Sequence, residues 1–226
     1  MNLATLTPLP AAIFSLLAIA SLLLAFVMLG SRWLDNYVYA FAAESWLIAA
    51  LSAAVGYYGH FPDLYAIAVL TVVFRGGILP WLVMRMVRRH NVRRELHVIL
   101  QPSSGLVIGG GLVVVALVLA RRLGLVLGSA GGIVILALAV MLAMELIGFL
   151  MLAVRDEAVS QVLGLLVLEN GIFLGSQILV PGMQALLEIV ILFDLLIVVA
   201  CFGVLVRYLT VHAGTTSSRD LRRLVG

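Results

Sequence analysis

The amino-acid sequence predicts an all-α, polytopic membrane protein with about seven transmembrane helices. Of its 226 residues, 64% are hydrophobic and 11% are charged, whereas soluble domains are roughly 45–50% apolar and about 25% charged. A folded soluble domain could not bury so much apolar surface. The apolar residues also fall into runs of membrane-spanning length, and the arginines gather between alternate runs. These three observations together predict a chain that crosses a lipid bilayer.

The seven spans are read from the lengths of the apolar runs. A helix that crosses a bilayer needs about 20 mostly apolar residues. Runs of this kind occupy residues 10–30, 37–58, 63–86, 103–120, 130–152, 159–180 and 183–207. The first run has neither a basic segment before it nor a clear cleavage site, so we expect a retained helix rather than a signal peptide.

The distribution of arginine predicts the orientation. All 14 basic residues are arginines, because the sequence contains no lysine. With the N-terminus outside, only Arg121 and Arg122 lie on the outer side and Arg75 lies within a span, which leaves the other eleven in the cytoplasm. Loops rich in arginine face the cytoplasm. The sequence therefore predicts an N-out, C-in protein of the inner (cytoplasmic) membrane.

Residue usage argues against several classes of site. Cys201 is the sole cysteine, and the four histidines show no metal-ligand spacing, so neither an intrachain disulfide nor a cysteine-rich metal centre is expected. The net charge of +3 comes from arginines at helix ends, which membrane topology explains without a nucleic-acid partner. We therefore expect no cofactor, no metal site and no catalytic residue in this chain. Any redox centre would belong to a partner.

Ionisable residues inside the predicted spans are the candidate functional residues, because charge is costly within a membrane and usually marks a functional site. They are Glu44, Arg75, Glu145, Glu169, Glu188 and Asp194. At a helical rise of ~1.5 Å per residue, five of them fall in one layer near the middle of the bilayer, and Glu188 lies nearer the outer face. A layer favours lateral transfer of ions between helices over a vertical channel.

Two local sequence patterns bear on helix geometry. Arg75 begins the segment Arg-Gly-Gly-Ile-Leu-Pro, in which the glycines and Pro80 weaken the helix, since proline lacks a backbone donor. Small residues at Gly124, Gly128 and Gly132 repeat every four positions, a spacing that lets helices approach closely in lipid. We interpret this repeat as a packing feature.

Three short motifs carry a resemblance to a known family. They are LVLENG at 166–171, LEIVILFD at 187–194 and RDLRRLVG at 219–226. In these motifs the chain resembles the hydrogenase-4 component E family, membrane subunits of complex-I-related nickel–iron hydrogenase and formate hydrogenlyase assemblies. Residues 130–226 also resemble the three-helix K-type subunit of complex I and the C subunit of Mrp antiporters. Those subunits place one glutamate in each of two consecutive helices. Glu169 matches the first position and Asp194 the second, with aspartate in place of glutamate.

The resemblance implies a function and a division of the chain. Residues 1–102 would form a three-helix membrane region with a basic cytoplasmic loop, 103–129 a linking helix, and 130–226 the K-type-like region with its tail. The chain would be a non-catalytic membrane-arm subunit of a hydrogenase-type oxidoreductase complex, with antiporter-like subunits and a peripheral hydrogenase-type module as partners.

The resemblance also assigns roles to the charged residues. Glu169, Asp194, Glu188, Glu145 and Glu44 would contribute to a proton or sodium path. The family tends to place a lysine where Arg75 stands. An arginine does not release its proton, so Arg75 is expected to modulate the path electrostatically.

Two other functions are compatible with the same residues. The chain could belong to a multisubunit cation/proton antiporter, although the Mrp C subunits resemble only its last three helices. Alternatively, it could be a structural scaffold in which the carboxylates only hold helices together, for example by pairing Arg75 with Glu44. Co-purification distinguishes the antiporter from the hydrogenase-type complex, because it shows which partner subunits are present. Carboxylate variants that assemble normally distinguish the scaffold from both ion-translocating functions.

Overall fold

Apart from short connections between helices, the part of the chain that the computed structural model describes is helical. That part comprises residues 8–89, 101–126, 132–155 and 158–179, with the single positions 189, 196 and 203. The helices are α1 (Pro8–Gly30), α2 (Leu34–Gly59), α3 (Asp63–Val73), the π-helical segment η2 (Phe74–Ile78), α4 (Leu79–Arg89), α5 (Pro102–Val126), α6 (Gly132–Val154) and α7 (Ala158–Leu179). No β-strand occurs among these residues. The predicted all-α class is therefore confirmed.

Five of the described helical stretches are long and apolar enough to cross a membrane. They are Pro8–Gly30, Leu34–Gly59, Asp63–Arg85, Ser103–Val126 and Gly132–Val154. Helix α7 has 22 residues, a length of about 33 Å at 1.5 Å per residue. These six stretches match the first six predicted spans to within a few residues at each end, apart from the fourth, which runs to Val126. The seventh prediction, 183–207, lies outside the described residues except at positions 189, 196 and 203.

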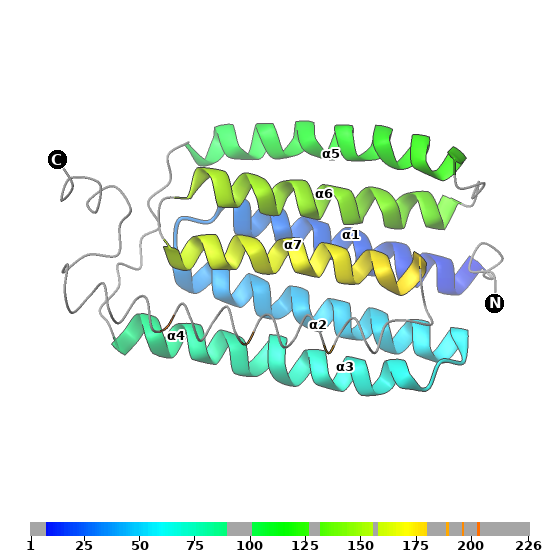
Figure 1. Ribbon diagram of the computed structural model, residues 1–226, viewed down its shortest axis with the longest axis horizontal. Coiled ribbons are helices and arrows are strands. Elements are labelled where there is room, and N and C mark those ends of the chain that lie inside the picture. The colour runs from blue at the N-terminus through cyan, green and yellow to red at the C-terminus, as the bar shows by residue number, and fades with distance from the viewer. Residues whose placement is uncertain are drawn as a thin grey trace.

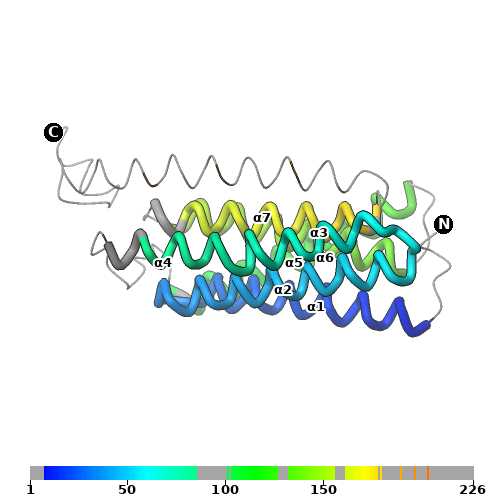
Figure 2. Tube along the Cα trace, turned by 90° about the horizontal axis from the view of Figure 1, so that it is seen from below, coloured from blue at the N-terminus to red at the C-terminus, as the bar shows by residue number. Residues whose placement is uncertain are grey.

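The helices run up and down in one bundle (Figure 1). Helices α1, α2, α7 and α6 contact one another in a ring. Helix α5 packs against α6 and α1 at one side, and the continuous stretch α3–η2–α4 packs against α2 at the other (Figures 1 and 2). Short connections keep consecutive helices side by side and antiparallel. Helix α2 is therefore the central element, and 56% of its most apolar stretch is buried within the protein, compared with 22% for α5.

Helices α6 and α7 approach each other at their glycines. A Cβ atom added to Gly148 would lie 2.9 Å from the carbonyl oxygen of Gly164, and one added to Gly171 would lie 2.8 Å from the Cβ of Met144. Such contact between backbones is the usual role of small residues between membrane helices. The repeat singled out in the sequence does not show this at Gly132, where an added Cβ would meet nothing within 4 Å. Gly128 lies outside the described residues.

The third span contains the predicted weak point. Residues Phe74–Ile78 form a π-helical turn, and the N–H of Leu79 donates to the carbonyl of Phe74, five residues earlier. Pro80 has no N–H to donate to the carbonyl of Gly76, so the ordinary α-helical pattern is interrupted here. The turn widens without breaking the span, and Arg75 lies inside it, 1% exposed. Such π-turns frequently accompany functional sites.

Candidate functional site

Three helical elements bring four polar side chains together in the interior of the bundle. Glu44 comes from the middle of α2, Arg75 from the π-helical turn η2, and Glu169 and Asn170 from the middle of α7. Each residue interrupts an apolar stretch, and each helix turns that residue toward its neighbours. We call these four residues the central polar cluster.

The central polar cluster is a continuous chain of contacts. The Nη1 atom of Arg75 donates a hydrogen bond to Oδ1 of Asn170 at 2.9 Å. The Nδ2 atom of Asn170 in turn donates to Oε2 of Glu44 at 3.0 Å. The Nη2 atom of Arg75 forms an ion pair with Oε2 of Glu169 at 3.6 Å. The guanidinium carbon of Arg75 also lies 5.5 Å from the centre of the Phe173 ring, a cation–π distance.

Burial makes these contacts energetically important. Glu44 and Asn170 have no exposed surface, Arg75 is 1% exposed and Glu169 is 14% exposed. Among the described residues, Oε1 of Glu44 and Nε of Arg75 have no hydrogen-bond partner. Removing one member of a buried ion pair leaves an uncompensated charge, which is strongly destabilising. The central polar cluster therefore places the permanent positive charge of Arg75 between the carboxyl groups of Glu44 and Glu169. Oε1 of Glu44 and Nε of Arg75 can each form a further hydrogen bond.

A second polar contact crosses the same α2–α7 interface. The Nε2 atom of Gln177 donates to the hydroxyl of Ser52, and that hydroxyl donates to the carbonyl of Ile48 at 3.0 Å. Ser52 lies eight residues after Glu44, which is about 12 Å along the helix. Both Ser52 and Gln177 are fully buried. The interface thus has polar side chains at two levels, the second being nearer the C-terminal ends of α2 and α7.

Of the remaining predicted residues, Glu145 is described by the structure and does not join the central polar cluster. Glu145 lies on α6, where its backbone nitrogen is 3.3 Å from a Cβ built on Gly171. Its side chain forms no hydrogen bond or ion pair with any residue that the structure describes. Glu188 and Asp194 lie outside the described residues. Within the described ranges, no three histidine, cysteine, aspartate or glutamate side chains group together as metal ligands.

Arg75 forms its ion pair with a different residue from the one that the scaffold interpretation named. That interpretation paired Arg75 with Glu44, but the ion pair is with Glu169, and Asn170 stands between Arg75 and Glu44. The reason is position along α7. Glu169 and Asn170 are consecutive, so together they can receive the two terminal nitrogens of one guanidinium group.

Arg155 is a buried polar residue that the sequence analysis treated only as a cytoplasmic charge. It is 2% exposed, and its Nη2 atom donates to the carbonyls of Met28, Leu29 and Ser31 at 3.0–3.1 Å. These carbonyls lie at the C-terminal end of α1, where a helix attracts positive charge. Asp156 and Glu157 follow Arg155 in the sequence, which is typical of an exposed turn and gives no sign of burial.

The sequence alone assigned no role to Asn170, Ser52 or Gln177, because the candidates for the ion path were chosen from the ionisable residues. Their signal was nevertheless present. Each is a polar residue inside an apolar run, and an amide or hydroxyl within a membrane span must find a hydrogen-bond partner.

Comparison with known proteins identifies one relative at the level of sequence. The chain is 30% identical over 178 residues to the uncharacterized protein Rv0085 of Mycobacterium tuberculosis, and the match covers 78% of this chain and 80% of that protein. No family model matches the sequence. No solved structure matches it either.

Proposed function

We propose that this chain, which belongs to the same family as the uncharacterized protein Rv0085 of Mycobacterium tuberculosis, is a non-catalytic membrane-arm subunit of a complex-I-like, hydrogenase-type respiratory complex. Its role is to contribute buried carboxyl groups to a proton or sodium path. The observation that carries the proposal is the central polar cluster, which joins α2, the third span and α7 through buried contacts of 2.9–3.6 Å. The resemblance of the C-terminal motifs to hydrogenase-4 component E supplies the class of complex.

The charges of the central polar cluster suggest how it handles ions. Arg75 keeps its proton, so with both Glu44 and Glu169 ionised the cluster carries a net charge of −1. One added proton or sodium ion neutralises it. A neutral cluster is favoured in a medium of low dielectric constant. The cluster therefore has the capacity to take up a single cation and to release it when a neighbouring charge changes.

The polar contacts indicate a direction for the path. The Ser52–Gln177 contact lies between the central polar cluster and one end of the bundle, and hydroxyl and amide groups can relay hydrogen bonds to water. Glu145, on the other side of α7 from α2, would serve a neighbouring part of the path. The K-type-like region would continue it through Asp194 and Glu188 toward antiporter-like partner subunits.

We further propose seven spans with the N-terminus outside and the C-terminus in the cytoplasm. In the described part, Arg32, Arg85 and Arg155 belong to the end of the bundle where α1 ends and α2 begins. Arg121 and Arg122 belong to the opposite end. An excess of arginine at one end supports the assignment of that end to the cytoplasm.

A structural scaffold is the second candidate, and a specific observation favours it. The hydrogen bonds and the ion pair of Arg75 link three helices, as a purely architectural contact would. The two candidates differ in what they require of Glu44 and Glu169. A scaffold needs their hydrogen bonds, whereas an ion path needs their ability to bind and release a cation.

The test uses Glu169→Gln and Glu44→Gln in the assembled complex, because glutamine keeps the shape and hydrogen bonding but carries no titratable proton. Proton uptake is measured in inverted membrane vesicles, and assembly by co-purification. We expect normal assembly with at least about a tenfold loss of translocation, which corresponds to about 1.4 kcal/mol. The matched control, Asp63→Asn, changes an exposed carboxylate at the start of α3 and should leave uptake unchanged.

The alternatives predict other outcomes. Variants that fail to assemble would support the scaffold, and variants that assemble and translocate normally would remove Glu44 and Glu169 from the path. Co-purification with antiporter subunits alone, without a hydrogenase-type module, would assign the chain to a stand-alone antiporter.

A further inference from the structure

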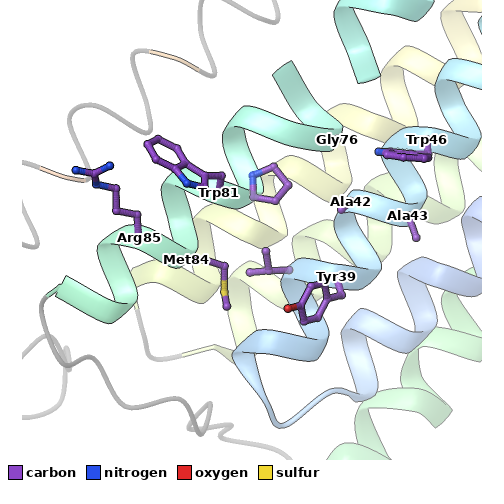
Figure 3. Close-up of a pocket in the computed structure, with 10 residues that line it drawn as sticks. Tyr39, Ala42, Ala43, Trp46, Gly76, Trp81, Met84 and Arg85 are labelled. Atoms are coloured by element: carbon purple, nitrogen blue, oxygen red, sulfur yellow. The ribbon is translucent and has the colours of Figure 1, made fainter. Parts of the chain in front are cut away.

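A groove of about 1020 Å³ runs along the side of the bundle between α2 and the η2–α4 stretch (Figure 3). Small residues contribute to its lining, namely Ala42 and Ala43 from α2 and Gly76 from η2. Trp46 closes one end, and Trp81 and Arg85 lie at the other (Figure 3). The groove is distinct from the central polar cluster, which lies within the bundle.

The sequence creates the groove by placing small side chains between large ones. The indole of Trp46 rests directly against the backbone of Gly76, where an added Cβ would collide with the Nε1 and Cδ1 atoms of the ring. Any larger residue at position 76 would push Trp46 away. The tryptophan is nonetheless 60% exposed, so its outer face remains open to whatever fills the groove.

The length of the groove matches half of a bilayer. Gly76 and Arg85 are nine residues apart, which is about 13 Å along a helix. The hydrocarbon core of a membrane is about 30 Å thick, so one leaflet contributes about 15 Å. Arg85 lies near the C-terminal end of α4 at Arg89. The groove therefore extends from the membrane surface to the middle of the membrane.

Charge is confined to the surface end of the groove. The guanidinium carbon of Arg85 lies 5.0 Å from the centre of the Trp81 ring, and among the described residues it has no acidic partner. The sequence from 85 to 94 contains five arginines. Arginine clusters directly after a membrane helix attract anionic lipid headgroups, and tryptophan favours the same interfacial level. The rest of the lining is apolar apart from the Tyr39 hydroxyl and the Trp46 indole N–H.

We propose that this groove is a binding site for an anionic phospholipid. The phosphate lies at Arg85, beside Trp81, and one acyl chain lies along Ala42 and Ala43 as far as Trp46. Arg85 at one end of the groove complements the negative headgroup of such a lipid. The apolar part of the groove is about as long as one leaflet is thick and complements the hydrocarbon tail. A transmembrane helix of a partner would instead need an apolar surface across both leaflets.

The proposal is tested by native mass spectrometry of the full chain in detergent, with phosphatidylglycerol or phosphatidylcholine added at equal concentration. We expect the wild-type chain to retain phosphatidylglycerol preferentially. Arg85→Gln should lower phosphatidylglycerol retention about fivefold and leave phosphatidylcholine unchanged. Ala43→Phe, which fills the apolar part of the groove, should lower retention of both lipids. Two controls should behave as the wild type, namely Arg122→Gln at the opposite end of the bundle and Ala50→Phe at an exposed position of α2.

Several results would overturn the assignment. Equal retention of the two lipids by the wild-type chain would remove the role of charge, and an equal effect of Arg122→Gln and Arg85→Gln would reduce it to general surface attraction. A dimer that carries no lipid and is dissociated by Ala43→Phe would assign the groove to a second copy of the chain.

Discussion

Glu44 and Asn170 lie 126 positions apart in the sequence and are joined by a hydrogen bond of 3.0 Å inside the bundle. Asn170 also accepts a hydrogen bond from Arg75, so a neutral amide separates a carboxyl group from a guanidinium group. The amide uses its donor for one and its acceptor for the other. It thereby sets the spacing between the carboxyl group of Glu44 and the guanidinium group of Arg75.

Asn170→Leu should destabilise the protein, because it removes both hydrogen bonds while keeping a similar volume. We expect the free energy of unfolding to fall by about 2–4 kcal/mol, since the groups left behind are buried and charged. Chemical unfolding in mixed micelles measures this value. Asn36→Leu, at an exposed position of α2, should change it by less than about 0.5 kcal/mol. Equal effects of the two substitutions would contradict the bridging role.

Arg75 and Glu169 should show energetic coupling in a double-mutant cycle. Arg75→Met alone should lower the free energy of unfolding by about 3–5 kcal/mol, because a buried carboxylate loses its counter-charge. Glu169→Gln in the same background should recover part of that loss, with a coupling energy above about 1 kcal/mol. The control cycle pairs Arg75→Met with Glu145→Gln, and these changes should add to within about 0.5 kcal/mol. A cycle with no coupling at Glu169 would mean that the 3.6 Å contact has no energetic weight.

Gly148→Ala should weaken the packing of α6 against α7. The new methyl group would lie 2.9 Å from two backbone atoms of α7, the carbonyl of Gly164 and the nitrogen of Leu168, so the helices must separate. We expect a loss of about 1–3 kcal/mol in the free energy of unfolding. Gly111→Ala, on α5, meets nothing within 4 Å and should be neutral or stabilising by up to about 1 kcal/mol. The reverse order would refute the close approach of α6 and α7.

Arg155→Met should loosen the C-terminal end of α1, because the carbonyls of Met28, Leu29 and Ser31 lose their common donor. Hydrogen bonds to a charged group are worth about 1.5–3 kcal/mol, so we expect a loss of about 2–4 kcal/mol and faster hydrogen exchange in the last turn of α1. Arg155→Lys should recover less than half, since an ammonium group lacks the planar fork. The exposed Arg32 provides the control, and Arg32→Met should leave exchange at α1 unchanged.

A reporter fused after Gly226 should be cytoplasmic, and one inserted at Gly59 should be external. This expectation follows from the excess of arginine on one side of the membrane. Each of the two positions is tested with two reporters, one that is active only in the cytoplasm and one that is active only outside it. A C-terminal reporter on the outer side would reverse the proposed orientation.

The sequence by itself determined the helical class, the approximate positions of the described helices and the weak point at Arg75. Spans can be predicted from sequence because each must satisfy its own backbone hydrogen bonds in lipid and must match the thickness of the bilayer. The weak point can be predicted because Pro80 lacks a donor regardless of what surrounds it. These features depend on short, continuous stretches of chain.

Only the tertiary structure decided which polar groups meet. Lipid tails and protein interiors are both apolar, so hydropathy does not reveal which face of a membrane helix turns inward. The packing of the helices brings Arg75 to Glu169 and Asn170. Glu145, predicted at a similar depth on α6, lies apart from the central polar cluster. The packing of the helices likewise buries Arg155 against α1 and places Gly148 against α7. These contacts join residues more than 15 positions apart, and their geometry is set by the packing of whole helices.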